Sequence, residues 1–276
     1  MTKIAEEPLV WLENPWARTE GVSPAIDNLL PDGVSYETRS FHSQIPGYEM
    51  TPLKRLPHLA ARLGLKNIWV KDESERMRLN AFKALGGSYA IYRLICKRLG
   101  VSQLSYSELM SDEIRERLGD MTFASATDGN HGKGLAWATQ KLRFPCIIYV
   151  HKHTSRARIE AIGQYGAEVR VVDGTYDDAV RQCQRDAEAN GWQIVSDTSW
   201  PGYEEIPQWV MQGYTTLLSE AQEQLAGQGV ARPTHILLQA GVGAFAAAMI
   251  AFYEKIFGAA APISVVVEPR TADCLY

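Results

Sequence analysis

The chain has 276 residues, of which 46% are hydrophobic and 22% charged, enough for one large domain or two modest ones. Its formal net charge is −4 without a long run of either sign, which argues against a nucleic-acid or anionic-membrane partner. The cysteines are far apart and have no zinc-site spacing, so we expect reduced thiols, no metal, and a cytoplasmic protein that binds small molecules. They are Cys96, Cys146, Cys183 and Cys274.

The first 50 residues are rich in proline, tryptophan and glycine and show little hydrophobic periodicity. This composition predicts an extended arm that wraps a larger body, or a partly ordered leader. The longest apolar stretch of the chain, 245–252, is too short to span a bilayer, so we expect no membrane anchor.

The next part of the chain leads to a lysine and a long helix. A short amphipathic helix is expected over 56–63 and a strand over 67–71, followed by a loop that ends at Lys83. The apolar spacing predicts a helix over 88–99, and a polar helical segment with capping candidates over 102–117.

Beyond residue 120, strands and helices alternate regularly. Strands are expected over 122–127, 146–150, 168–172, 193–196, 235–239 and 263–267. Helices are expected over 132–141, 155–165, 176–189, 206–225 and 244–257. This alternation predicts an α/β protein with parallel sheets covered by helices on both faces. A strand end meets a turn near Trp200-Pro201-Gly202, where we place the boundary between two α/β domains.

Lys83 stands in the stretch Asn-Ala-Phe-Lys-Ala-Leu-Gly-Gly, residues 80–87, between an aromatic residue and small residues. On composition alone, the stem of such a lysine packs while its ammonium reaches water. A partly desolvated lysine instead has a lowered pKa, and its neutral amine can form a Schiff base with a carbonyl compound. This stretch alone leaves both interpretations open.

The stretch Ser-Ala-Thr-Asp-Gly-Asn-His-Gly, residues 125–132, follows a predicted strand and opens a predicted helix. Backbone N–H groups and the positive end of a helix at this place suit an anion, such as a substrate carboxylate. Asp128 or Asn130 could instead be only an N-cap. We interpret His131 as structural, because the sequence shows no ligand or nucleophile beside it.

A second glycine-rich stretch, Gln-Ala-Gly-Val-Gly-Ala-Phe-Ala at 239–246, also lies between a strand and a helix. Its glycines allow the backbone to approach a phosphate closely. It also fits a dinucleotide fingerprint with alanine in the third position, and Glu268 stands where a ribose-binding acid is expected. A nucleotide-dependent dehydrogenase is therefore an alternative. Asp197, at a strand end, lies where ligands gather in α/β sheets or caps a turn.

The lysine stretch, the Gly-Asn-His-Gly helix start and the distant glycine-rich loop, in this order, resemble the fold-type II pyridoxal-phosphate enzymes. These are relatives of the tryptophan synthase β subunit and of the threonine dehydratases, and the resemblance runs from about Thr51 to the C-terminus. The chain has Ala-Phe-Lys where the usual pattern is Ser-Phe-Lys, and Asp128 where it has Ser or Thr. At both of these positions the chain resembles those members of the family that are ammonia-lyases acting on a diamino acid.

The resemblance implies a two-domain, tryptophan synthase β-like α/β architecture with parallel-rich sheets. Residues 1–85 and 201–276 would form a large cofactor-binding domain, and residues 86–200 a small α/β domain. It also implies a cytoplasmic homodimer that acts in amino-acid catabolism.

The same resemblance implies pyridoxal 5'-phosphate as the cofactor, with Lys83 as its Schiff-base lysine, Phe82 packing that lysine and Asn130 contacting the ring hydroxyl. The residues implied for the phosphate are Gly241, Val242, Gly243, Ala244 and Phe245. The implied reaction is α,β-elimination of D- or L-2,3-diaminopropionate to pyruvate and ammonia. Lys83 and Asp128 would act as acid/base groups on opposite faces of the cofactor, and Asp197 would lie near the substrate amine.

The chain ends at Cys274-Leu275-Tyr276 while the alternation of strands and helices is still under way. In the family a later segment carries the Ser or Thr that partners the pyridine nitrogen, and the sequence contains no match for it. We therefore expect a C-terminally incomplete large domain. The alternatives are a truncated non-enzymatic or weakly active remnant, or another fold-type II dehydratase or lyase.

Overall fold

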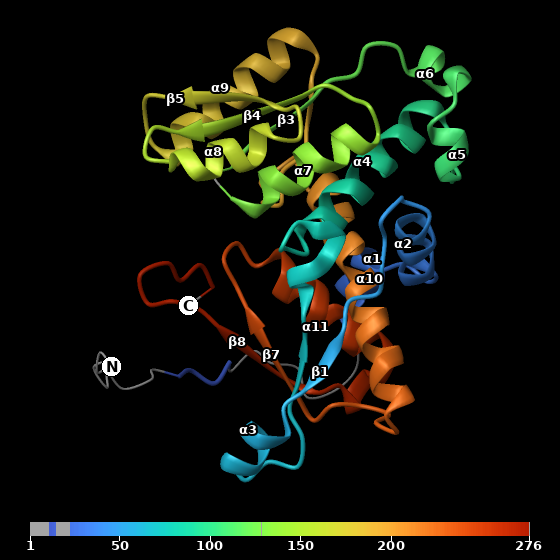
Figure 1. The fold of residues 1–276 in the computed structure, drawn as a ribbon, viewed down its shortest axis with the longest axis vertical. Coiled ribbons are helices and arrows are strands. Elements are labelled where there is room, and N and C mark those ends of the chain that lie inside the picture. The colour runs from blue at the N-terminus through green and yellow to red at the C-terminus, as the bar shows by residue number, and fades with distance from the viewer. Residues whose placement is uncertain (1–10, 15–22, 128, 276) are drawn as a thin grey trace.

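The computed structural model describes residues 11–14, 23–127 and 129–275 (Figure 1). Its main sheet has four parallel strands in the order β5-β4-β3-β6. These are β3 (Phe123–Ala126), β4 (Cys146–His151), β5 (Glu168–Val172) and β6 (Gln193–Ile194). The predicted parallel sheet is confirmed, and all four strands lie close to their expected positions.

Helices cover both faces of this sheet. The helices are α7 (Asn130–Lys141), α8 (Arg156–Gly163) and α9 (Tyr176–Asn190). Ile147 of β4 packs with Ala179 and Cys183 of α9, whereas the next residue, Ile148, belongs to the core that includes Leu135 of α7. Side chains that alternate between two covered faces explain why β4 is apolar and buried from Cys146 to Val150.

A second group of strands lies outside residues 123–194. β7 (His235–Gln239) and β8 (Ile263–Val267) pair in parallel, and α11 (Ala244–Phe257) connects them. β1 (Leu53–Arg55) and β2 (Trp69–Lys71) form an antiparallel pair joined through α3 (Pro57–Arg62). A 3₁₀ segment, η1 (Glu73–Arg78), follows β2, and η2 (Gly258–Ala260) follows α11. The domain boundaries at 85/86 and 200/201 stay a prediction.

The expected extended arm is wrong for the described part of residues 1–50, which contains α1 (Pro24–Leu29) and α2 (Val34–Ser43). The remainder of that prediction, on residues 1–10 and 15–22, lies outside the described residues. Thr38 and His42 of α2 are buried and hydrogen-bond to Thr215 and Thr216 at 2.8 and 2.7 Å. The buried face of α2 is partly polar, which is why hydrophobic periodicity missed the helix.

The central helix is α4 (Lys83–Leu99), which packs against both α7 and α10 (Glu205–Gly227), as Figure 1 shows. It begins five residues before the predicted start, because Gly86 and Gly87 were interpreted as part of a small-residue corner. A Cβ at Gly86 would lie 2.7 Å from atoms of Val210 and Tyr214, so glycine there permits close helix packing. The polar segment is two short helices, α5 (Tyr106–Leu109) and α6 (Asp112–Leu118), both with serine N-caps.

Candidate active site

Lys83 is the first residue of α4, and its amine forms an ion pair with the carboxylate of Asp197, just beyond β6. The Lys83 side chain is 27% exposed and that of Asp197 is 10% exposed. The lysine is therefore partly desolvated, and it is held by a carboxylate that is nearly buried.

The loop before Lys83 has an unusual backbone. Met77, Arg78 and Asn80 have φ angles of 51°, 58° and 56°, in the left-handed region that residues other than glycine rarely adopt. The Nζ of Lys133 on α7 donates a hydrogen bond to the Leu79 carbonyl at 2.8 Å. Such a conformation persists only where the surrounding structure imposes it. Here the loop leads directly into α4, whose first residue is Lys83.

Two glycines on neighbouring helices let their backbones touch the first turn of α4. A Cβ at Gly134 of α7 would lie 2.8 Å from the nitrogen of Ala84, and one at Gly213 of α10 would lie 2.5 Å from the carbonyl oxygen of Leu85. No side chain fits at either position without a shift of backbone. The sequence analysis missed both, although a glycine inside a helical pattern is a usable signal of close approach.

His131, the second residue of α7, lies beside Asp197. Its Nδ1 is 3.7 Å from the Asp197 carboxylate, and its Nε2 is 2.9 Å from the carbonyl of Val195. A carbonyl only accepts, so Nε2 carries a hydrogen. The structural interpretation of His131 stays a prediction, but the ring has a carboxylate neighbour that the sequence analysis did not identify. The carboxyl ends of the adjacent strands β3 and β6 meet at one sheet edge, and that topology could have paired residues 131 and 197.

The electrostatics of this cluster favour a charged Asp197. Burial raises the pKa of Asp197, but attraction to the His131 ring when that ring is protonated, attraction to Lys83 and the hydrogen bond from Lys83 bring it below its usual value. Burial, with the nearby Asp197 charge, raises the pKa of the fully buried Tyr214 phenol well above 10. Among the described residues, neither the Tyr214 hydroxyl nor His131 Nδ1 has a hydrogen-bond partner. The cluster therefore has polar atoms available for a ligand or a proton.

The structure also brings the second glycine-rich stretch to the lysine loop. The ring of Phe82, which precedes Lys83, lies 4.5 Å from that of Phe245 and 5.2 Å from that of Tyr214. Gly243 is the N-cap of α11 with φ 84°, and a Cβ at Gly241 would meet no atom within 4 Å. The stretch that leads into α11 thus has open space at Gly241 and lies near the lysine loop through Phe245.

The sequence analysis named three further site candidates, Asn130, Asp128 and Glu268. Asn130 is exposed as the first residue of α7, next to His131. Asp128 lies outside the described residues. The carboxylate of Glu268 accepts hydrogen bonds from the backbone nitrogens of Cys274 and Leu275 at 2.7 and 3.0 Å, so it is engaged in the turn that follows β8.

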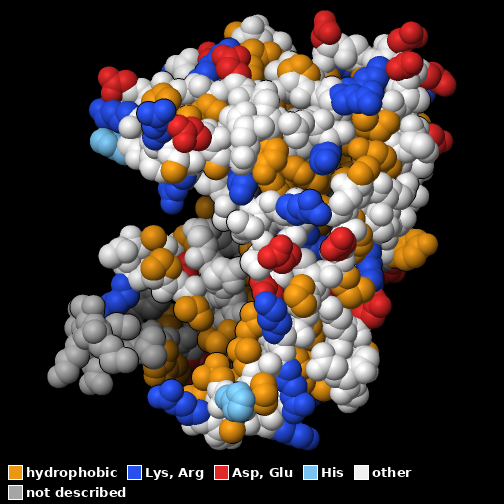
Figure 2. Space-filling model, viewed as in Figure 1, with side chains coloured by type: hydrophobic (Ala, Val, Ile, Leu, Met, Phe, Trp, Pro, Cys, Tyr) orange, Lys and Arg blue, Asp and Glu red, His pale blue; other side chains and the backbone are white. Residues whose placement is uncertain are grey.

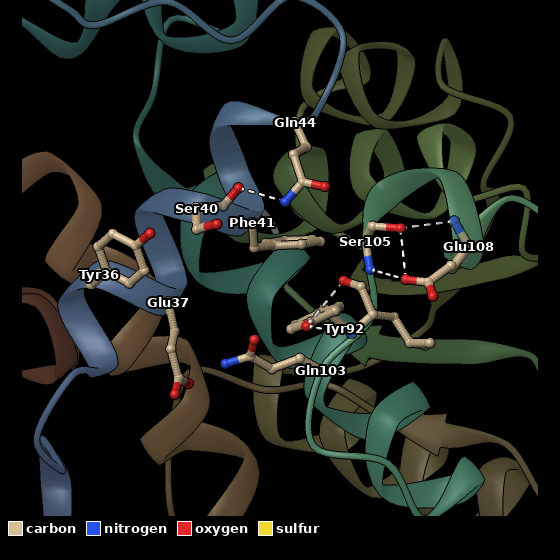
Figure 3. Close-up of a pocket in the computed structure, with 10 residues that line it drawn as sticks. Tyr36, Glu37, Ser40, Phe41, Gln44, Tyr92, Gln103, Ser105 and Glu108 are labelled. Carbon is tan, nitrogen blue, oxygen red and sulfur yellow. Dashed lines mark hydrogen bonds between the residues drawn. The ribbon is translucent and has the colours of Figure 1, made fainter.

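Figure 2 shows the surface hollowed at the left, between the part that contains β3, β4 and β5 and the part that contains β7 and β8. A separate cavity of about 300 Å³ lies between α2 and the 103–108 segment (Figure 3). The rings of Phe41 and Tyr92 stack in it at 4.3 Å, Gln44 donates to the Ser40 carbonyl, and Glu108 is used to cap α5. None of the predicted site residues lines this cavity, so it is not the candidate site.

Within the described residues, no helix is both long and apolar enough to cross a membrane. In the same part of the chain, no group of three or more His, Cys, Asp or Glu side chains could hold a metal ion. Of the described cysteines, Cys96, Cys146 and Cys183 are buried free thiols and Cys274 is an exposed one.

Residues 45–276 match the family model described as "Pyridoxal-phosphate dependent enzyme". The chain is 47% identical over 251 residues to a diaminopropionate ammonia-lyase of Salmonella typhimurium, covering 90% of this chain and 62% of the relative. It is also 47% identical over 239 residues to that of Escherichia coli K12, covering 86% of this chain and 59% of the relative. The chain thus spans about three fifths of the length of these relatives.

Solved structures agree with this similarity. The Escherichia coli diaminopropionate ammonia-lyase in complex with D-serine superposes with a TM-score of 0.85 at 46% identity, over 92% of this chain and 64% of that one. The same enzyme in complex with an aminoacrylate-PLP azomethine reaction intermediate gives a TM-score of 0.83 at 45% identity, over 92% of this chain and 63% of that one. The expected fold-type II architecture is confirmed, and these matches displace the dehydrogenase alternative.

Proposed function

Because the chain belongs to the pyridoxal-phosphate dependent enzymes, we propose that it binds pyridoxal 5'-phosphate and eliminates ammonia from 2,3-diaminopropionate, and that water then hydrolyses the released enamine product to pyruvate and a second ammonia. The observation that carries the proposal is the ion pair between Lys83 and the nearly buried Asp197, beside His131, whose Nδ1 has no hydrogen-bond partner among the residues that the structure describes. A lysine in such a pair is held in one place and has a neighbour that can exchange its proton.

The residues present fit this cofactor, which carries an aldehyde, a ring hydroxyl and a phosphate. Lys83 would hold the aldehyde carbon, Asn130 the ring hydroxyl, and residues 241–245 the phosphate. Supporting this fit are the open space at Gly241, the helix start at Ala244 and the contact between Phe82 and Phe245. When bound, the cofactor supplies an electron sink for the charge left at Cα when its proton is removed.

The side chains of this chain would move the protons. Lys83, as a free amine, takes the Cα proton from one side of the substrate, and Asp128 is the predicted base for the other side, so one site would accept both enantiomers. The amino group leaves as ammonia only when protonated, and either of these groups can return the proton. Asp197 would attract the cationic side chain of diaminopropionate, an attraction that the hydroxyl of serine lacks.

The test is spectroscopic and then chemical. Protein mixed with pyridoxal phosphate is expected to turn yellow, with an absorbance band that is lost on borohydride treatment, and to release pyruvate from D- and L-2,3-diaminopropionate. Lys83→Ala should abolish both signals. Lys152→Ala, which removes an exposed lysine paired with Asp173, should change neither. A folded protein without the band contradicts the proposal and supports a non-enzymatic remnant.

The two bases can be separated with enantiomers. Asp128→Asn is expected to reduce the reaction of D-diaminopropionate more than that of the L-isomer, because Lys83 still serves the other side. Equal losses on both isomers would contradict the assignment of the bases to opposite sides.

We also propose that the protein is a cytoplasmic homodimer that acts in amino-acid catabolism. The support is the family resemblance, together with the three buried cysteines, which are free thiols. Light scattering after size-exclusion chromatography tests the dimer, and a mass of about one chain would contradict it.

A further inference from the structure

His131 has one ring nitrogen committed to the backbone and one that is not. The Nε2–H donates to the carbonyl of Val195 at 2.9 Å, which fixes the orientation of the ring. Nδ1 is buried, has no hydrogen-bond partner among the described residues, and faces the Asp197 carboxylate at 3.7 Å. A buried polar atom without a partner costs free energy, so this nitrogen points to a role that a satisfied ring would not have.

Asp197 lies between two groups that can carry the same proton. Its Oδ2 accepts the hydrogen bond from Lys83 and is also the oxygen nearest to His131 Nδ1. A lysine ammonium has no lone pair, so Lys83 must lose a proton before it can attack a carbonyl or take the Cα proton. If Asp197 kept that proton it would lose its charge, and if water took it the nearly buried carboxylate would have no adjacent cation.

We infer that His131 holds the proton that Lys83 releases, with Asp197 as the relay between them. One N–H bond breaks at Nζ, one forms at Nδ1, and Asp197 is a carboxylate before and after. An ammonium, a carboxylate and a neutral imidazole become an amine, a carboxylate and an imidazolium, so the net charge of the cluster does not change. The inference rests on the proposed function and gives Lys83 its neutral form without removing the charge that attracts the substrate.

The other titratable groups around Asp197 are not placed to accept the proton that Lys83 releases. Tyr214, from α10, keeps its proton, because burial and Asp197 raise the pKa of its phenol well above 10. The Tyr203 hydroxyl donates to the Ile194 carbonyl and accepts from the Ser196 nitrogen, both at 2.9 Å, which holds the segment that carries Asp197. Lys133, on the same helix as His131, donates to the Leu79 carbonyl. His131 is thus a positioning residue that acts on Lys83 through Asp197.

The first test uses the protein without cofactor. With ¹⁵N-labelled histidine, the ring-nitrogen NMR signals of His131 report its protonated fraction between pH 6 and 9. Lys83→Met removes the cation from Asp197, so the protonated fraction of His131 at a given pH is expected to be larger than in the wild type. Lys83→Arg keeps the cation and should match the wild type, whereas Asp197→Asn added to Lys83→Met should cancel the shift.

His42 is the internal control. Its ring is fully buried and bonded to Thr216, Leu85 and Ser88, and burial, with Arg76 nearby, lowers its pKa to about 3. It should stay neutral in every variant. If His131 shows the same titration in wild type and Lys83→Met, the relay is wrong.

The second test separates the relay from the proposed function. His131→Gln should still bind pyridoxal phosphate at Lys83, but the rate of band formation is expected to need a pH about one unit higher than in the wild type. An unchanged pH profile with an intact band overturns the relay and leaves the proposed function standing. A wild type without a band, in which His131 nevertheless responds to Lys83→Met, supports the relay and contradicts the proposed function.

Discussion

Two clusters of charged side chains lie beside α10, and they are built in opposite ways. In the first, here called the Arg76 network, Arg76 and Glu220 are fully buried, and hydrogen bonds from Arg76, Lys71 and Tyr48 all converge on the Glu220 carboxylate. Arg76 also bonds both carboxylate oxygens of Glu73. In the second, the Lys83 cluster, Lys83 is partly exposed, and His131 Nδ1 and the Tyr214 hydroxyl have no hydrogen-bond partner in the part of the chain that the structure describes.

The difference is the one that we expect between a structural charge cluster and a functional one. Every charged group of the Arg76 network is paired with an opposite charge inside the protein. Removing one member therefore leaves a buried charge without its partner. The Lys83 cluster retains atoms that can still bond, and water already reaches its lysine. We therefore expect substitutions in the first to change stability, and substitutions in the second to change chemistry.

The largest effect is expected for Glu220→Gln. It leaves Arg76 and Lys71 with an uncharged partner in a buried place and should lower the free energy of unfolding by about 3–5 kcal/mol. Glu223→Gln, one turn further along α10, breaks an exposed pair with Arg39 and should cost less than about 1 kcal/mol. Urea unfolding measures both, and equal costs would remove the distinction between buried and exposed pairs.

The same carboxylate makes the stability depend on pH. Burial raises the pKa of Glu220, but hydrogen bonds and attraction from Arg76 and Lys71 outweigh it and lower the pKa from an ordinary 4.5 to about 2. Since the folded pKa is depressed, the stabilisation is complete above pH 4.5 and is lost as pH falls from 4.5 towards 2. Urea midpoints measured between pH 6 and pH 3 should therefore fall more steeply in wild type than in Glu220→Gln. Parallel curves would contradict this.

An intermediate effect is expected where helix backbones touch around Lys83. Gly213→Ala places a Cβ against the Leu85 carbonyl and should cost about 1–3 kcal/mol, because backbone has to move. Gly227→Ala, at the end of the same helix, meets no atom within 4 Å and should gain up to about 1 kcal/mol, because alanine favours helix. Thermal unfolding gives the sign of the stability change for each variant. Changes of the same sign in both would contradict the close approach of the backbones at Gly213.

The smallest change in stability is expected for Asp197→Asn. Its partner Lys83 is partly exposed, so water can replace the lost carboxylate and the cost should stay below about 1 kcal/mol. The preference for diaminopropionate over serine should nevertheless fall, because the attraction to the substrate cation is gone. A preference that does not change contradicts the role of Asp197.

The sequence predicted the strands and helices after residue 120 well, because apolar strands and amphipathic helices there agree with local propensity. It failed on α2, whose buried face includes Thr38 and His42, and on the start of α4, where Gly86 and Gly87 lie inside a helix. The motif stretches identified Lys83, Asp197 and the 241–245 loop as candidates. The Asp197–His131 contact depends on which strands become neighbours, a fact of tertiary pairing that no local pattern contains.

The pairing of Lys83 with Asp197 also has a consequence for how the protein folds. The two residues are 114 positions apart in the chain, and the segment that carries Lys83 is tied to α10 by contacts that span 144 positions. Contacts of such long range form late, because the intervening chain must first be ordered. During synthesis Lys83 is therefore expected to stay solvated until residues 197 and 220 are available to pack against it and its segment. The ion pair that fixes the position of Lys83 is therefore a product of the finished fold, and an incomplete chain is expected to lack it.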